Sequence, residues 1–332
     1  MSFYDGAVRD ERVREYVPVK RVLWESGCRN AGAFVGRKEL QPEYGSETVR
    51  PEIREGGGIL LDFGIELHGG IRLVNSSRRG ARIRLRFGES ASEAMGTPDQ
   101  DHAIHDAVLE LPTGGMLEYG NTAFRFVRID AVHEPLVLLN VIAVAQFLDL
   151  EYAGSFESSD ERLNRIWKTA AYTLHLNMQD YIYDGVKRDR LVWMGDLHPE
   201  ICGILSVFDD VSLIPASLDF VRDHTPLPRV MNNITSYSLW WIVNQYEYYL
   251  HRGDLVYLQE QREYLTGLLR QLEEYVNQDG SEAVPPRRFL DWPNNDNPQG
   301  LHAGLHGLLY WAFRCGLNIC RSLETDTLLC RT

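Results

Sequence analysis

The spacing of hydrophobic residues changes once along this chain, close to Gly154, and the change divides the sequence into a β part and an α part. Before it, the stretch 82–87 alternates arginine with an apolar residue. A period of two places alternate side chains on opposite faces, so this stretch predicts a half-buried strand. Several such stretches, separated by turn residues such as Gly69-Gly70, predict an antiparallel β-sandwich over residues 1–152. The further strands are expected at 71–74, 107–111 and 124–129.

After Gly154 the apolar residues recur at helical spacing. Ser158, followed three residues later by Glu161, fits a capping box and predicts the start of a helix. The apolar stripe expected on this helix comprises Leu163, Ile166, Trp167, Ala170, Ala171 and Leu174. Further helices are expected at 193–207, 212–223, 236–251, 254–277 and 303–323. The second part of the chain, 153–332, is therefore predicted to be all-α.

Length and charge exclude several classes of protein. The 332 residues are enough for about two domains. The 34 basic and 47 acidic residues give a net charge of −13, which argues against a nucleic-acid partner. No apolar run approaches the ~18–20 residues of a membrane span and the first residues do not resemble a signal peptide, so we expect a cytoplasmic protein with no membrane partner. The five cysteines lack C-x-x-C spacing, and we expect no metal and no cofactor.

The segment 184–196 carries the most chemistry, because three aspartates, two arginines and a tryptophan share thirteen residues. Burying such charges is costly unless they are paired, so the segment is either a solvated loop or an ordered site. Hydrolysis of a sugar needs a carboxylic acid that stays protonated, other carboxylates that orient hydroxyls or water, and an aromatic face for the pyranose ring. The residue types for one half of such a site are present.

This segment resembles the signature of glycoside hydrolase family 78, the α-L-rhamnosidases of the six-hairpin glycosidase superfamily. The stretch from Ser155 to Trp167 also resembles the start of that family's barrel, and the stretch 289–292 resembles its later sugar-contact loop. The resemblance covers roughly residues 55–332 and implies a β-sandwich ahead of an (α/α)6 barrel. The signature positions that match are Asp184, Arg188, Arg190, Trp193, Gly195 and Asp196.

The resemblance implies an inverting glycoside hydrolase that acts on terminal rhamnose or a related sugar in a glycan or glycoside. Asp189 lies where the family has its general-acid glutamate, so it is the implied catalytic residue. An inverting enzyme also needs a base on the opposite face of the sugar, with the two carboxyl groups ~6.5–9.5 Å apart. The substrate-binding positions implied by the resemblance are Asp184, Arg188, Trp193, Asp196, Asp291 and Trp292.

Two departures from the signature leave the activity open. Asp189 is one methylene shorter than the family's glutamate, and a shift of about 1 Å in a catalytic group can cost ~10²-fold in rate. Gly185 and Val186 stand where the family has Cys and Pro, which suggests a diverged subgroup with another substrate. The alternative to an enzyme is an inactive fragment or a carbohydrate-binding remnant, and other chemistry on the same scaffold also stays open.

The number of helices predicts an incomplete barrel. Twelve helices of at least ~12 residues, with loops of ~5, need at least ~200 residues, whereas 153–332 supplies about six helices. We therefore expect the N-terminal half of a catalytic domain, with the general base beyond Thr332. Another helix is expected to begin within 324–327. The uncovered apolar face of such a half-barrel is expected to favour self-association.

Other residues admit both a functional and a purely structural interpretation. The stretch 101–106 combines two histidines with two acids but offers no third metal ligand, so a metal site there is the weaker hypothesis. His302 and His306 are either a hydrogen-bonded core pair or substrate contacts. Glu200 is the best spare acid, although a capping or exposed position is expected. Most rings of the aromatic stretch that begins at Trp240 are expected in the core.

Overall fold

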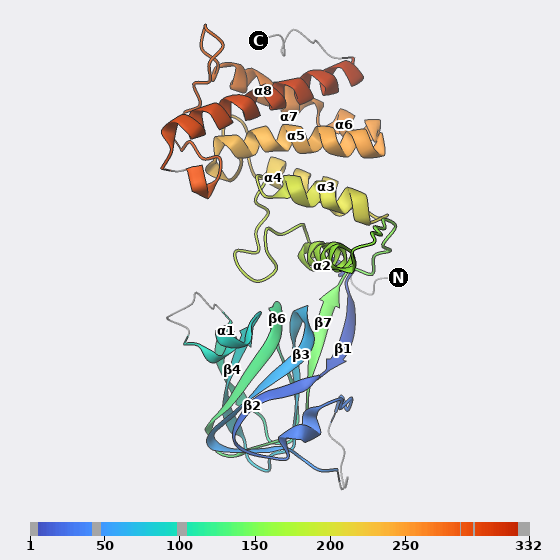
Figure 1. Cartoon of the computed structure of the whole chain (residues 1–332), viewed down its shortest axis with the longest axis vertical. Helices are drawn as coiled ribbons and strands as arrows, with labels where there is room; N and C mark the ends of the chain where they lie inside the picture. The colour runs from blue at the N-terminus through green and yellow to red at the C-terminus, as the bar shows by residue number, and fades with distance from the viewer. Residues whose placement is uncertain (1–5, 42–47, 98–104, 286, 295, 325–332) are drawn as a thin grey trace. The chain divides into compact units, whose positions relative to one another are not determined.

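The computed structural model describes residues 6–41, 48–97, 105–285, 287–294 and 296–324. The chain forms two compact units (Figure 1). The β unit comprises Met1–Asp149 together with Val186–Asp189, and the helical unit comprises Leu150–Gly185 and Arg190–Thr332. The short segment Val186–Asp189 thus groups with the β unit, although the residues on both sides of it belong to the helical unit.

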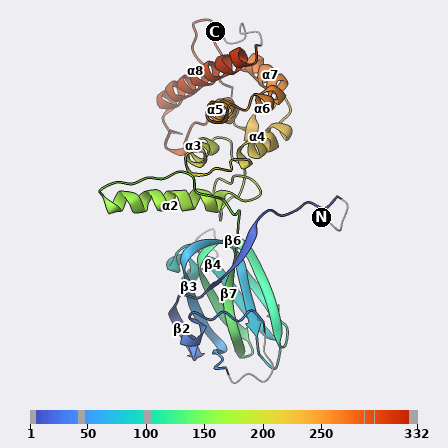
Figure 2. The ribbon, with the colours of Figure 1, turned by 90° about the vertical axis from the view of Figure 1, so that its right-hand side faces the viewer.

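The β unit is built on one strongly curved sheet, as Figures 1 and 2 show. Its strand order is β1-β7-β3-β6-β4-β5, and β2 pairs with β3. The pairings are antiparallel except for that of β3 with β7, which is parallel. The fold is that of the predicted β-sandwich. The strands are β1 (Val13–Pro18), β2 (Arg21–Arg29), β3 (Glu52–Asn75), β4 (Ala81–Gly88), β5 (Asp106–Leu111), β6 (Gly115–His133) and β7 (Leu136–Phe147).

The alternation expected on β4 is present, with one exception. Ile83 and Leu85 are buried in the core of the β unit while Arg84 is exposed. Arg86 lies on the same face as Arg84 but is only 3% exposed. The short helix α1 (Ala91–Met95) contacts β4, and the Arg86 guanidinium donates to the carbonyl oxygen of Glu93 at 2.8 Å. A charge on the outer face is therefore buried because α1 covers it.

The expected turn at Gly69-Gly70 is wrong, because both glycines lie inside β3. The pairing of β3 with β6 shifts register between Gly69 and Ile71, which marks a bulge. A Cβ on Gly69 would lie 2.0 Å from the carbonyl oxygen of Val144, and Gly69 has a φ of +142°. Glycine is needed here for the close approach of two backbones within the sheet, and β3 continues through it.

The helical unit contains the predicted helices in sequence order. In its described part, α5 packs against α3 and against α8 (Figure 1). The arrangement is that of part of an (α/α)6 barrel. The expected helix 254–277 is interrupted at the buried Gln261, whose amide donates to Asp219. The helices are α2 (Glu161–Asn177), α3 (Leu197–Val207), α4 (Leu213–Asp223), α5 (Thr235–Arg252), α6 (Leu255–Glu260), α7 (Arg262–Glu273) and α8 (Pro298–Ser322).

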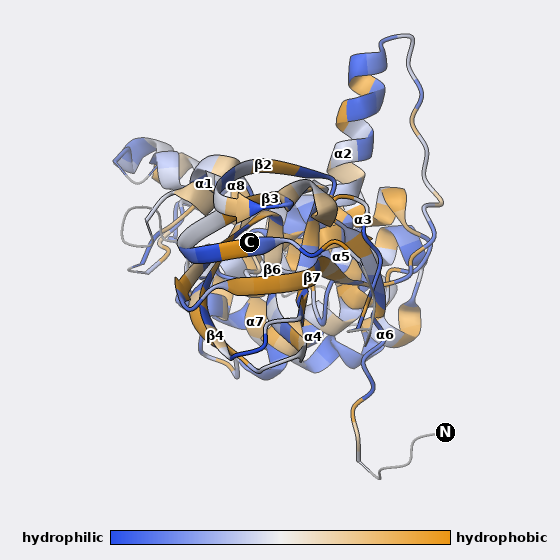
Figure 3. Ribbon diagram, turned by 90° about the horizontal axis from the view of Figure 1, so that it is seen from below, coloured by the Kyte–Doolittle hydropathy of each residue, from blue (hydrophilic) through white to orange (hydrophobic). Residues whose placement is uncertain are grey.

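The start and the buried face of α2 differ from the prediction. Asp160, and not Ser158, caps the helix, because its carboxylate accepts from the backbone N–H of Arg162 at 2.8 Å. Of the predicted apolar stripe, Leu163 and Ile166 are exposed. Hydrophilic and hydrophobic residues share the length of α2 (Figure 3). The buried side chains of this helix instead lie mainly in its last two turns.

The described residues contain no helix that is long and apolar enough to span a membrane. Within the same part of the chain, no group of three His, Cys, Asp or Glu side chains is arranged to hold a metal ion. Asp101 and His102, from the weak metal motif, lie outside the described residues, and so does most of the helix expected from 324 onward. The described cysteines Cys28, Cys202, Cys315 and Cys320 are free thiols.

Candidate functional site

Asp184 closes the first part of the segment 184–196 into a loop. Its backbone N–H donates to the carbonyl oxygen of Leu191 at 3.1 Å, and its carboxylate accepts from the N–H of Leu191 at 2.9 Å. The Arg190 guanidinium lies over the ring of Tyr183, 6.0 Å from its centroid. One carboxylate oxygen of Asp184 thus stabilises the loop, so this residue has a structural role in addition to any role in binding.

Asn232 and Tyr237 fix the second part of the segment. The side-chain oxygen of Asn232 accepts from the N–H of Met194 at 3.1 Å, and its amide donates to the carbonyl oxygen of Val192 at 3.1 Å. The ring of Tyr237 lies directly against Gly195, because a Cβ there would be 2.3 Å from the Tyr237 Cε1. Gly195 is therefore needed for this close packing.

Four aromatic rings from three segments form one connected cluster in the helical unit. The ring of Trp193 meets that of Tyr237 with centroids 6.0 Å apart. Tyr237 in turn lies 6.3 Å from Phe289, and Phe289 lies 5.3 Å from Trp292, which is 78% exposed. The hydroxyl of Ser236 on α5 donates to the carbonyl oxygen of Phe289 at 2.5 Å and ties the later loop to this helix. We call these four rings the aromatic cluster.

The negative charges of three aspartates act on the phenol of Tyr237. Its hydroxyl donates to the Asp196 carboxylate at 3.2 Å. Burial raises the pKa of the Tyr237 phenol far above its ordinary value, and the negative charges of Asp196, Asp184 and Asp291 raise it further. Tyr237 thus marks the place where the predicted residues of two distant segments meet.

Glu200, on the first turn of α3, is a largely buried carboxyl next to this group. Burial raises its pKa to about 8; the nearby Asp196 and Asp184 also raise it, and a hydrogen bond from Asn177 to its Oε1 at 3.0 Å acts in the opposite direction. Its Oε2 is buried without a hydrogen-bond partner among the described residues. The carboxyl is therefore mostly neutral at pH 7. The expectation that Glu200 caps a helix or lies in solvent is wrong, since Asp196 holds the N-cap position of α3.

An ion-pair clamp holds the loop that carries Asp291 and Trp292. Glu282 is fully buried, and its carboxylate pairs with the guanidinium of Arg288 and with His302 of α8. Burial alone would raise the pKa of Glu282, but hydrogen bonds from the N–H of Val284 (2.8 Å), Arg288 and His302 outweigh it and lower the pKa. His302 is thus neither a core residue nor paired with His306, and both histidines are exposed.

The other two predicted site residues, Arg188 and Asp189, group with the β unit. Both side chains are exposed, and Asp189 has a φ of +46°. Their neighbour Lys187 is buried in the β unit. Five of the predicted residues thus lie in the helical unit, and Arg188 and Asp189 lie in the other one. The five are Asp184, Trp193, Asp196, Asp291 and Trp292.

Several residues important to this geometry were not singled out from the sequence. Tyr237 and Asn232 lie about 40 residues from the partners they hold, and Glu282 has no motif around it. Among the aromatic residues, Trp241 is buried in the core as expected. Trp240 stacks on His198 with ring centroids 4.8 Å apart, and Trp311 of α8 meets both rings. Only the three-dimensional packing identifies these contacts.

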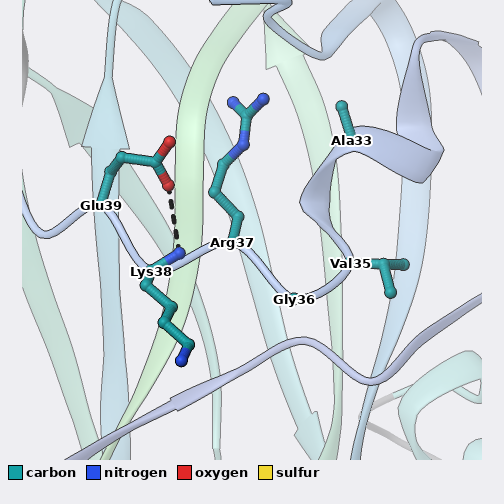
Figure 4. A pocket seen from close by; sticks show the side chains of 6 residues that line it. All are labelled: Ala33, Val35, Gly36, Arg37, Lys38 and Glu39. Atoms are coloured by element: carbon teal, nitrogen blue, oxygen red, sulfur yellow. Dashed lines mark hydrogen bonds between the residues drawn. The ribbon is translucent and has the colours of Figure 1, made fainter.

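A pocket of about 620 Å³ in the β unit offers little chemistry (Figure 4). It is lined by the segment from Ala33 to Glu39. The Arg37 guanidinium already donates to the carbonyl oxygens of Leu139 (2.5 Å) and Val49 (2.7 Å). The carboxylate of Glu39 accepts from the backbone N–H of Lys38 at 3.1 Å. Its main charged groups thus serve the fold, and the candidate site remains the residues around Tyr237.

Comparison with known proteins relates the helical part of the chain to one family. Residues 151–305 match the family described as the bacterial α-L-rhamnosidase six-hairpin glycosidase domain. An α-L-rhamnosidase of Alteromonas sp. (strain LOR) is 27% identical over 173 residues, which are 50% of this chain and 19% of that protein. The chain therefore spans only a minor part of the length of this curated relative.

Solved structures extend the likeness of fold to the β unit. A rhamnosidase from Klebsiella oxytoca with rhamnose bound aligns with 97% of this chain and 68% of its own, at a TM-score of 0.77 and 19% identity. A family GH78 rhamnosidase of Bacillus sp. GL1 aligns with 90% of this chain and 32% of its own, at a TM-score of 0.72 and 20% identity. At these identities the comparisons show a shared fold.

Proposed function

We propose that the chain takes part in inverting hydrolysis of terminal α-L-rhamnosides or a related sugar, because residues 151–305 match the bacterial α-L-rhamnosidase six-hairpin glycosidase domain. The relative from Klebsiella oxytoca was solved with rhamnose bound, which supports this choice of sugar. The observation that carries the proposal is the hydrogen bond from Tyr237 to Asp196 within the aromatic cluster, where the negative charges of Asp184 and Asp291 also act on the phenol.

The helical unit is proposed to hold the sugar. Carboxylates accept hydrogen bonds from sugar hydroxyls, and Asp196 is fixed for this purpose by its bond from Tyr237. The exposed ring of Trp292 offers a flat apolar face to the pyranose, as aromatic side chains do at surfaces that are partly wet. Glu200 is mostly neutral at pH 7, so it adds little negative charge beside Asp184 and Asp196.

Asp189 is proposed to donate the proton to the glycosidic oxygen. The bond from that oxygen to the anomeric carbon breaks as the proton arrives, and water attacks the same carbon from the opposite face. The residues assigned here supply the acid half of this reaction, and the base that activates water is not assigned. Asp189 is exposed, so its carboxyl can meet a substrate, but it is shorter than the glutamate of the resembled family.

Asp189→Asn tests this role. It removes the donated proton, so hydrolysis of a rhamnoside with a poor leaving group should fall at least ~10²-fold, while a nitrophenyl rhamnoside, which needs little protonation, should lose far less. Rates on both substrates measure the difference, and Asp180→Asn, in the preceding turn, is the matched control. An equal loss on the two substrates rules out Asp189 as the acid.

Carbohydrate binding without turnover is the second candidate, and the short side chain of Asp189 favours it. On this hypothesis the chain binds rhamnose but releases no product from either substrate. Trp292→Ala should then weaken rhamnose binding about tenfold or more by calorimetry, because the exposed ring is the proposed stacking face. Trp311→Ala, which removes a ring outside the aromatic cluster, is the control and should leave the affinity unchanged.

A further inference from the structure

Lys187 is a buried cation two residues before Asp189. Its side chain is 3% exposed, and its Nζ pairs with a carboxylate oxygen of Glu93 and donates to the carbonyl oxygen of Phe87 at 3.2 Å. The carbonyl oxygen of Lys187 lies 3.4 Å from the Nε2 of His105. A buried lysine is costly unless it is paired, so these contacts must hold the segment Val186–Asp189 closely.

The position of Glu93 is set by the cap of the short helix α1. The hydroxyl of Ser90 accepts from the N–H of Glu93 at 3.1 Å, and the Oε2 of Glu93 accepts from the N–H of Glu89 at 2.8 Å. These two bonds cap the helix from both directions, although the Glu93 carboxylate accepts from the residue before the N-cap and not from the N-cap Ser90 itself, as it would in a capping box. One oxygen of Glu93 is therefore used by the helix, and the other is presented to Lys187.

The surroundings of Lys187 are rich in negative charge. Glu66 is half-buried, and this burial raises its pKa to about 8; Glu89 and Glu93 raise it further, while the Lys187 cation lowers it. The guanidinium of Arg86 is turned to the backbone of Glu93. Lys187 is thus a cation that pairs with Glu93 and acts on Glu66, and it comes from the segment that carries Asp189.

The backbone beyond this anchor is in a conformation that needs support. Asp189 has a φ of +46° and Arg190 a φ of +55°, a region that side-chain-bearing residues seldom adopt. Two such residues in succession persist only where their neighbours hold them. On the N-terminal side, the anchored residue that precedes them is Lys187, which contacts Glu93 and Phe87.

We propose that Lys187 and Glu93 are a positioning pair, by which the β unit fixes the place and direction of Asp189. This inference rests on the proposed function, because it assumes that Asp189 is the proton donor. Its structural half, that the ion pair orders residues 184–192, does not depend on catalysis. The two halves can therefore be tested by separate measurements on the full chain.

Hydrogen exchange tests the structural half. Lys187→Met removes the charge while keeping most of the apolar stem, and it should make the amides of 184–192 exchange roughly tenfold faster. Glu93→Gln should have the same effect, and the double variant should add little, because both break one interaction. Lys168→Met, at an exposed lysine of α2, is the matched control. Unchanged exchange in 184–192, or faster exchange throughout the β unit, overturns the anchor.

Kinetics test the functional half. If Lys187→Met displaces the proton donor by about 1 Å, kcat on a rhamnoside with a poor leaving group should fall ~10²-fold. On a nitrophenyl rhamnoside, which needs little protonation, kcat should fall less than about tenfold, and KM should change little on either substrate. Lys187→Arg keeps the charge and should recover most of the loss. Equal losses on both substrates overturn the positioning role.

The two failures are distinguishable. If the unchanged chain hydrolyses neither substrate, the proposed enzyme activity fails, and hydrogen exchange still decides whether Lys187 anchors the segment. If the chain is active and Lys187→Met has wild-type kinetics, the positioning pair is wrong and the proposed activity stands.

Discussion

Gly195 is the residue whose size most directly controls the packing at the candidate site. Its hydrogen atom faces the ring of Tyr237, and an added Cβ would come within 2.3 Å of that ring. Gly195→Ala should therefore lower the free energy of unfolding by about 1–3 kcal/mol, through the displacement of Tyr237, as measured by urea denaturation.

The same substitution elsewhere provides the control. Gly307 lies in α8, where a Cβ would meet nothing within 4 Å. Gly307→Ala should stabilise the chain by about 0.5–1 kcal/mol, because alanine loses less conformational freedom in a helix. If Gly195→Ala lowers the free energy of unfolding and Gly307→Ala raises it, the loss at Gly195 is caused by the contact with the Tyr237 ring and not by alanine itself. A neutral Gly195→Ala would contradict the close packing described here.

Two residues, Asp160 and Ser158, can be compared as the capping residue at the start of α2. Asp160→Ala removes the side chain that accepts from the N–H of Arg162, and it should cost about 1 kcal/mol of stability. Ser158→Ala removes only an exposed hydroxyl that accepts from the N–H of Asp160 at 3.2 Å, so its cost should be smaller. Thermal unfolding of the two variants measures the difference. A larger loss for Ser158→Ala would restore the capping residue expected from the sequence.

Local sequence patterns predicted where strands and helices lie better than they predicted which segments pack against them. Period-two alternation in 82–87 identified β4, because one face of that strand packs in the core. The apolar spacing of 163–174 correctly indicated a helix, yet Leu163 and Ile166 are exposed, since burial depends on what packs against a face. Gly69-Gly70 has the composition of a turn and lies inside β3, because a second strand approaches there.

The candidate site could be predicted only where the chemistry is contiguous in sequence. The segment 184–196 was found because its charges and tryptophan are adjacent. Tyr237, which Asp184, Asp196 and Asp291 all affect, stands in an aromatic helix without a motif of its own. Glu282 is similarly isolated, and its pairing with Arg288 and His302 arises from the course of the loop to α8. Long-range contacts of this kind leave no local signal in one sequence.

Two half-buried carboxyls, one in each unit, make the stability of the chain depend on pH. Burial raises the pKa of Glu66 and of Glu200 to about 8, against an ordinary value of 4.5. Between these values the folded chain keeps protons that the unfolded chain releases, so stability falls as the pH rises from about 4.5 to about 8.

Asp62 acts in the opposite direction. Burial opposes its ionisation, but hydrogen bonds from Arg125 and Arg21 outweigh it and lower the pKa to about 2. The stability that Asp62 contributes is present above its ordinary pKa of 3.8 and is lost as the pH falls toward 2. These groups together predict the highest Tm near pH 4–5, and calorimetry from pH 3 to 9 measures it.

Neutral substitutions test the cause of this dependence. Glu66→Gln and Glu200→Gln should each raise the Tm at pH 9 by a few degrees and flatten the decline above pH 5, since an amide has no charge to bury. Glu260→Gln, at an exposed position of α6, should leave the curve unchanged. A decline that persists in the double variant would show that other groups cause it.

The grouping of Val186–Asp189 with the β unit has a consequence for protein engineering. Related proteins are commonly recombined at the crossover between two structural modules, which here lies between Asp149 and Leu150. A chimera joined at that point would combine Lys187 with a foreign sandwich that lacks Glu93 and the cap of α1. Such hybrids should express as folded protein, but the segment Val186–Asp189 should be disordered. Order should return if the foreign sandwich has a carboxylate at the position of Glu93.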